Sequence, residues 1–179
     1  MTNLDTFRQQ RALVSFRRAE IDEFKIQGFV VGVSEQLTLV QYVYDFNLDG
    51  LMVLRTSDIS EVTRNATDEF QQSLLHSEGL LARVPFDHPL DLSSWPSAIG
   101  GLCKDFPLLI LERELLEDPD LAIGRILRVG DDEVQLKYFT GAGRWLDEPE
   151  SLRYSDITCC QAGTNYINVY QRFFERNEL

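Results

Sequence analysis

The chain contains the stretch RTSDISEV at residues 55–62 and a close variant of it, RYSDITCC, at residues 153–160. The two stretches share the tripeptide Ser-Asp-Ile and lie 98 positions apart in a chain of 179 residues. The first stretch follows the apolar residues LMVL at 51–54, which are typical of a buried strand. The repetition predicts two copies of one small β-rich unit, and chance similarity between two β-rich segments is the alternative.

The similarity extends backwards from Ser-Asp-Ile in both copies. Residues 37–39, LTL, match residues 134–136, VQL. Further matches pair a glycine and two apolar residues in each copy, namely Gly28, Val30 and Val33 with Gly124, Ile126 and Val129. The offset falls only from 98 to 96 over this distance, so small insertions alone separate the copies.

The pattern of the first copy is typical of strands. The segments KIQGFVVGV, LTLVQYVYD and GLMVLRTSDI are rich in β-branched and aromatic residues, and polar breaks separate them. Asp49-Gly50 predicts a tight hairpin turn, because glycine tolerates positive φ. Short strands bent into a small barrel bury one face and avoid long exposed edges. We therefore predict a mainly β fold with a few short helices (α+β), which forms two tandem five-stranded barrels.

The expected division of the chain follows from the two copies. Residues 1–64 form the first barrel with a short N-terminal helix, residues 65–105 a connector of helices and loops, and residues 106–179 the second barrel with a C-terminal extension. Asn65 is expected to cap one helix of the connector, and Ser94 or Ser97 to lie near the start of another.

Charge and cysteine content limit the partners and the compartment. The net charge is −12, spread over both halves of the chain as −5 for residues 1–90 and −7 for residues 91–179. Such a surface repels phosphate backbones and anionic lipids and favours solubility or a basic partner. Three cysteines without framework spacing predict a reduced, cytoplasmic protein. No signal peptide and no membrane span are expected.

The first copy resembles the Sm-like (LSm) family of small five-stranded barrels, although other SH3-like barrels share such patterns. Gly28, Val30, Val33 and Leu37 fall on the glycine and apolar steps of the first family motif, and residues 53–59 with Val62 follow the second motif apart from its glycine. The second copy matches less well. The chain as a whole is also similar to uncharacterised bacterial proteins that carry this duplication.

The resemblance implies where RNA would bind, but this sequence departs from the family pattern there. Family members bind RNA with a loop Asp and Asn and with an Arg-Gly pair. The Asn position holds Thr38 in the first copy and Gln135 in the second. Arg55 and Arg153 are retained, without the glycine that follows in the family. Nucleic-acid binding is therefore the weaker expectation, and an arginine that covers apolar neighbours with its stem is the alternative.

Catalytic and metal-binding patterns are not found in the sequence. The two histidines, His76 and His88, both fall in the connector, and Cys103 lies in an apolar context that is typical of a core residue. The acidic runs at 117–120 and 130–133 fall between expected strands and are typical of solvated turns. No phosphate-binding, nucleophile-elbow or zinc-ligand motif occurs. We therefore expect no enzyme activity, no metal and no cofactor.

Three hypotheses about function remain. The first is a non-enzymatic interaction or scaffold protein whose barrels pack together or assemble through free strand edges. The second is an acidic, immunity-type antagonist of a basic toxin or nuclease. The third is RNA binding in the Sm-like manner. Arg144 and Trp145, flanked by glycines in a long loop, are either a recognition tip or a side-chain pair in which Trp145 folds back over the barrel end.

Overall fold

The computed structural model of the chain describes residues 4–177 and contains ten strands, four α-helices and two short 3₁₀ helices. The strands of the first half are β1 (Leu13–Arg17), β2 (Ile26–Val33), β3 (Leu37–Tyr44), β4 (Asn47–Arg55) and β5 (Glu61–Thr63). Those of the second half are β6 (Leu109–Arg113), β7 (Asp120–Val129), β8 (Glu133–Tyr138), β9 (Glu150–Arg153) and β10 (Cys159–Ala162). The helices are α1 (Leu4–Gln10), η1 (Thr56–Asp58), α2 (Ala66–Ser77), η2 (Leu81–Arg83), α3 (Trp95–Leu102) and α4 (Asn165–Asn177). Within residues 4–177, no helix has both the length and the apolar character that a membrane span requires.

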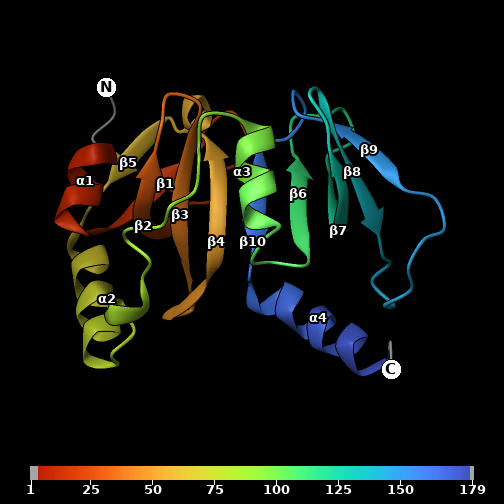
Figure 1. Cartoon of the computed structure of the whole chain (residues 1–179). Coiled ribbons are helices and arrows are strands. Elements are labelled where there is room, and N and C mark those ends of the chain that lie inside the picture. The colour runs from red at the N-terminus through yellow and green to blue at the C-terminus, as the bar shows by residue number, and fades with distance from the viewer. Residues whose placement is uncertain (1–3, 178–179) are drawn as a thin grey trace.

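The ten strands form one antiparallel sheet in the order β5-β1-β2-β3-β4-β10-β6-β7-β8-β9 (Figure 1). The two halves of this order have the same arrangement. The strands β10-β6-β7-β8-β9 correspond one by one to β5-β1-β2-β3-β4. The registers correspond as well, since Gly28 lies opposite Tyr42 and Gly124 lies opposite Tyr138. Descent of both halves from one duplicated unit stays a prediction.

The prediction of two separate five-stranded barrels is wrong. Closing the first barrel requires β4 to pair with β5, but β4 pairs with β10 instead, and β10 pairs with β6 on its other side. Three of the four residues of β10 are buried, namely Cys159, Cys160 and Ala162, whereas none of the three residues of β5 is buried. The β4–β10 pairing therefore buries more apolar surface than closure on β5. It joins the two halves into one open sheet, with β5 and β9 at its edges.

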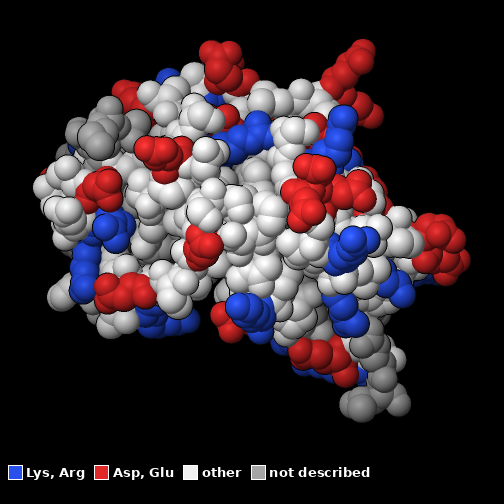
Figure 2. All heavy atoms as spheres, turned by 45° about the horizontal axis from the view of Figure 1, so that its top comes forward, with Lys and Arg blue, Asp and Glu red and all other residues white. Residues whose placement is uncertain are grey.

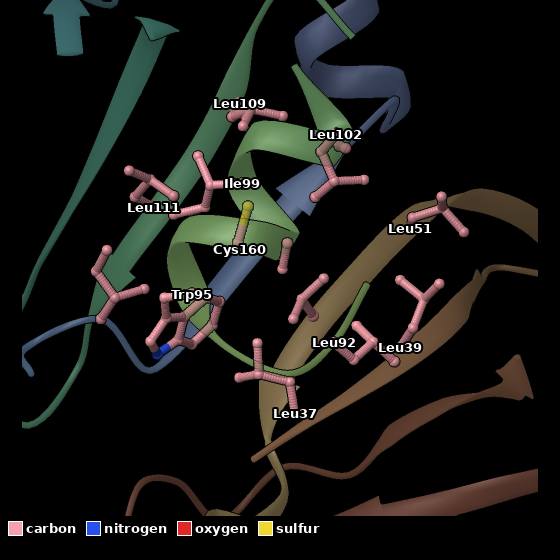
Figure 3. Close-up of a cluster of buried hydrophobic side chains, with 14 of the residues drawn as sticks. Leu37, Leu39, Leu51, Leu92, Trp95, Ile99, Leu102, Leu109, Leu111 and Cys160 are labelled. Atoms are coloured by element: carbon pink, nitrogen blue, oxygen red, sulfur yellow. The ribbon is translucent and has the colours of Figure 1, made fainter. Parts of the chain in front are cut away.

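The middle segment supplies part of the central core. Helix α3 begins after Ser94, whose side chain accepts a hydrogen bond from the backbone N–H of Ser97, so the helix start predicted near these serines is confirmed. Figure 1 shows α3 in front of β10 and its neighbours, at the junction of the two halves. Figure 3 shows side chains of α3 among those of β3, β4, β6 and β10, with Trp95, Ile99 and Leu102 near Leu37, Leu39, Leu51, Leu109, Leu111 and Cys160. One apolar core therefore spans both halves and the segment predicted as a connector.

The predicted helix after Asn65 is confirmed. The Asn65 side chain accepts hydrogen bonds from the backbone N–H groups of Thr67 and Asp68, and the Asp68 carboxylate accepts one from the Asn65 N–H. Asp68 is buried and also accepts hydrogen bonds from Ser15 and Gln27, both at 2.8 Å. These bonds tie the start of α2 to β1 and β2.

The predicted hairpin turn at Asp49-Gly50 is wrong, since both residues lie inside β4. The turn between β3 and β4 consists of Asp45 and Phe46, which adopt positive φ angles of 46° and 62°. Gly50 does adopt a positive φ, of 78°, but it does so where the backbone at Ala162 and Gly163 comes close to it. Glycine at position 50 therefore allows the backbone at the end of β10 to lie close to β4.

The two matched glycines allow neighbouring backbones to approach closely. A Cβ atom at Gly28 would lie 2.5 Å from the carbonyl oxygen of Gln41, and one at Gly124 would lie 2.0 Å from that of Lys137. Since these oxygens belong to paired strands, we expect Gly28→Ala and Gly124→Ala each to lower the free energy of unfolding by about 1–3 kcal/mol. Chemical denaturation measures the change. The control is Gly100→Ala in α3, where an added Cβ would have no atom within 4 Å. We expect this variant to raise the free energy of unfolding by about 0.5–1 kcal/mol. Equal stability of all three variants would contradict the close-approach explanation.

Candidate functional site

The residues predicted for RNA contact in the first half are engaged within the protein. Thr38 is fully buried, and its hydroxyl lies 2.9 Å from that of Thr56. The Arg55 guanidinium donates a hydrogen bond to the carbonyl oxygen of Ser155. The two Ser-Asp-Ile turns therefore meet at the junction of the halves. A hollow of about 570 Å³ lies beside them and is partly lined by the N-terminal residues of α3.

The corresponding residues of the second half make their contacts within that half. Gln135 lies opposite Ser151 in the β8–β9 pair, and Arg153 lies opposite Glu133. The Arg153 guanidinium donates a hydrogen bond to the Asp156 carboxylate at 3.0 Å. The pKa of Asp156 is lowered mainly by its hydrogen bond with Ser155 and to a smaller extent by this one with Arg153. Because Thr38 is fully buried, the four predicted RNA-contact residues are not all available on the surface.

The loop residues Arg144 and Trp145 have different environments. Arg144 is exposed, whereas Trp145 is half-buried and packs against Phe139 and Phe174, with ring centroids 5.3 and 4.6 Å away. The cationic groups of Arg125 and Lys137 lie over its ring at 5.5 and 5.8 Å. The Trp145 ring is therefore packed against the second half of the sheet and helix α4.

Burial makes the thiols poor nucleophiles. It raises the pKa of Cys103 to about 11 and raises those of Cys159 and Cys160 still further. Neither His76 nor His88 hydrogen-bonds to Cys103 within the described chain. Among residues 4–177, no group of three or more His, Cys, Asp and Glu side chains has the arrangement of a metal site.

These pKa shifts predict slow thiol chemistry. We expect the native protein to react with Ellman's reagent far more slowly at pH 7 than the unfolded chain, in which all three cysteines react. The rate at Cys103 should rise about tenfold per pH unit until the pH approaches its pKa, because the thiolate is the reacting species. Absorbance at 412 nm follows the reaction. Fast labelling of Cys103 in native protein at neutral pH would contradict the prediction.

The most distinctive surface feature is a groove between the β3–β4 hairpin and helix α4, here called the tyrosine groove. Its volume is about 860 Å³. Its apolar lining consists of Tyr44, Leu48, Leu80, Tyr166, Val169 and Tyr170, and its charged lining of Asp45, Asp49 and Arg83. The hairpin turn and the start of α4 both lie at the lower border of the sheet in Figure 1. Side chains from three distant parts of the sequence therefore form this groove.

Helix α4 is held rigidly against the groove at its N-terminus. The backbone N–H of Asn165 donates to the Asp49 carboxylate at 2.6 Å, which joins the first turn of α4 to β4. The Tyr170 hydroxyl donates to the carbonyl oxygen of Gly141 at 3.0 Å and lies 3.5 Å from the Tyr166 hydroxyl. The pKa of Tyr166 is raised mainly by the hydrogen bond between its hydroxyl and that of Tyr170. The two tyrosine rings, whose centroids are 5.3 Å apart, are therefore ordered before any partner binds.

The opposite wall of the groove is a strained turn. Asp45 and Phe46 both occupy the left-handed region, which non-glycine residues seldom adopt and which is most unusual for phenylalanine. The turn leaves Phe46 51% exposed and Tyr44 63% exposed. Strained backbone is concentrated at functional sites, where surrounding structure maintains it.

A stripe of exposed apolar side chains on α4 continues the groove surface. Tyr166, Val169 and Phe173 are each about half exposed and follow the i, i+3, i+7 spacing of one helix face. The neighbouring face carries the buried Ile167 and Phe174. Sequence reasoning missed this surface, although α4 carries more large apolar side chains than the two that it buries, and this excess was a usable signal.

The arrangement is suited to binding and lacks an evident catalytic group. It offers ordered aromatic rings, two carboxylates and one guanidinium around an open hollow, which are groups that recognise another molecule. Comparison of the chain with protein-family models, curated proteins and solved structures finds no match. The fold and the groove define a mainly β protein with one open antiparallel sheet, four α-helices and an exposed groove lined by aromatic residues.

Proposed function

We propose that the chain is a non-enzymatic interaction protein that binds another protein through the tyrosine groove. The observation that carries this proposal is the clustering of large exposed side chains around one hollow, which Tyr44 of the hairpin lines together with Tyr166 and Val169 of α4. Scattered exposed apolar residues are ordinary on protein surfaces, but a contiguous cluster marks an interaction site. Tyrosine is also among the residues enriched at interface centres.

Site-specific photocrosslinking tests the proposal. We expect p-benzoylphenylalanine at Tyr166 to give discrete crosslinked products when the chain is expressed in its cells of origin. The matched control is the same residue at Phe24, which is 83% exposed and does not line the groove. Discrete products from Tyr166 alone support the proposal. No product, or the same products from both positions, contradicts it.

Self-association is a second form of the same function. The edge strands β5 and β9 each have one side without a strand partner within the described chain. The internal β4–β10 pairing shows how such edges can join, because β4 corresponds to β9 and β10 corresponds to β5. Size-exclusion chromatography with light scattering tests this form: a discrete oligomer supports it, and a monomer at high concentration excludes it. Absorbance at 260 nm across the same peak reports whether nucleic acid is bound.

An acidic antagonist of a basic toxin or nuclease is a second candidate function. The net charge of −12 favours it, because opposite fields accelerate the encounter of two proteins. On the face shown in Figure 2, acidic side chains are spread over the surface and interspersed with basic ones. Failure to retain basic proteins at low salt would exclude this function.

A further inference from the structure

We infer that the tyrosine groove recognises a basic segment of its partner, in which a lysine or arginine side chain lies next to apolar ones. The inference rests on the proposed function and specifies the chemistry of the partner. The faces of tyrosine rings attract cations, and the stems of lysine and arginine pack on apolar surfaces. The groove provides both kinds of contact in Tyr44, Tyr166 and Val169.

The charges of the groove favour a cation. Asp45 is exposed at the tip of the hairpin, and no hydrogen bond or ion pair engages its carboxylate within the described chain. Asp49 lies further inside and uses Oδ1 to accept the Asn165 N–H. Arg83 is the one basic side chain among the lining residues. A cationic group in the groove would therefore be attracted by Asp45 and Asp49 and repelled by Arg83. The net charge of −12 on the whole chain adds to the attraction.

The ordering of the groove raises the affinity that these contacts can give. The Tyr166 and Tyr170 hydroxyls are paired, and Tyr170 is also bonded to the 139–149 loop through Gly141. Side chains that are already ordered lose little conformational entropy on binding. A single extended or helical segment that crosses the groove would also cover the exposed stripe of α4.

Two dye-labelled peptides test the inference by fluorescence anisotropy with the full chain, one of alternating lysine and leucine and one of alternating glutamate and leucine. We expect the lysine peptide to bind, more weakly at higher salt, and the glutamate peptide to bind at least about tenfold more weakly. Equal binding of the two peptides, or no binding of either, overturns the inference.

Variants within the groove should change the affinity in opposite directions. Tyr44→Ala is expected to weaken binding of the lysine peptide about tenfold. Asp45→Asn should weaken it about fivefold, and it retains a residue that tolerates the left-handed region. Arg83→Gln should strengthen binding about twofold to threefold, because it removes the repelling cation. A general loss of folding would weaken binding in every variant, so it cannot explain weaker binding in Asp45→Asn together with stronger binding in Arg83→Gln.

The control variant is Asp118→Asn, in the exposed loop between β6 and β7 at the other end of the sheet. It removes the same charge from the chain, and we expect the affinity to stay within about twofold. Equal losses in Asp118→Asn and Asp45→Asn would overturn the inference, because they would show attraction by net charge alone. Groove crosslinks to a partner that lacks a basic segment would overturn it as well, while leaving the proposed function intact.

Discussion

Replacing Arg18 by methionine is expected to lower the free energy of unfolding by about 3–5 kcal/mol, because it leaves the partly buried carboxylate of Glu114 without its cationic partner. Arg18 follows β1 and is only 5% exposed. Its guanidinium donates two hydrogen bonds to Glu114, at 2.6 and 2.9 Å, and Glu114 also accepts one from the Thr158 hydroxyl at 2.7 Å. Burial alone would lower the pKa of Arg18, but the hydrogen bond to Glu114 and the negative groups nearby, Glu114 and Glu112 among them, together raise that pKa.

A neighbouring ion pair provides the control. Arg17 and Glu61 approach to 3.7 Å, and about half of each side chain is exposed. Arg17→Met is therefore expected to change the stability by at most about 1 kcal/mol. The double variant Arg18→Met/Glu114→Leu should recover most of the loss, because it removes the unpaired charge together with its partner. Urea denaturation measures all four proteins, and a double variant as unstable as Arg18→Met would contradict the ion-pair explanation.

The Arg18–Glu114 pair also shows where sequence reasoning ends. Arg18 and Glu114 each follow the last residue of a strand, β1 in the first half and the corresponding β6 in the second half. Local patterns identified most strands and the caps at Asn65 and Ser94, since backbone preference and capping depend on neighbouring residues. The contact between Arg18 and Glu114 depends on how the halves join, which no local pattern encodes.

The same limit explains the wrong prediction of separate barrels. β5 and β10 both follow a Ser-Asp-Ile turn, so either strand was a reasonable partner for the edge of β4. The choice of β10 follows from the buried Cys159, Cys160 and Ala162, which become core residues only when β6 and α3 are in place. Pairing across about 100 residues is decided by the summed burial of the assembled sheet, and a single strand does not specify it.

The groove was missed for a related reason. Its walls come from the β3–β4 hairpin and from α4, which are more than 100 residues apart in the sequence. Asp49-Gly50 matched the usual hairpin pattern, whereas the observed turn places Phe46 in a conformation that propensity disfavours. Disagreement between local preference and structure is expected at functional sites, which supports assigning the binding surface to this turn.

Replacing Phe139 by alanine is expected to lower the free energy of unfolding by about 3–5 kcal/mol. Phe139 is 2% exposed and lies at the centre of an aromatic cluster that attaches α4 to the second half of the sheet. Its ring centroid lies 4.8 Å from that of Tyr170, 5.0 Å from that of Phe174 and 5.3 Å from that of Trp145. The cavity left by alanine would remove all three ring contacts and loosen one wall of the tyrosine groove.

Phe173→Ala is the matched control, because Phe173 lies on the same helix but is 45% exposed. We expect it to cost at most about 1 kcal/mol, and Phe139→Leu to cost about 1–1.5 kcal/mol, since leucine fills most of the space. Near-UV circular dichroism should weaken in Phe139→Ala below the unfolding transition, because Trp145 and Tyr170 lose their fixed environment. If Phe139→Ala costs no more than Phe173→Ala, the aromatic cluster does not hold α4 in place. The groove would then owe its shape to the Asp49–Asn165 hydrogen bond and to Ile167, which is buried near the start of the helix.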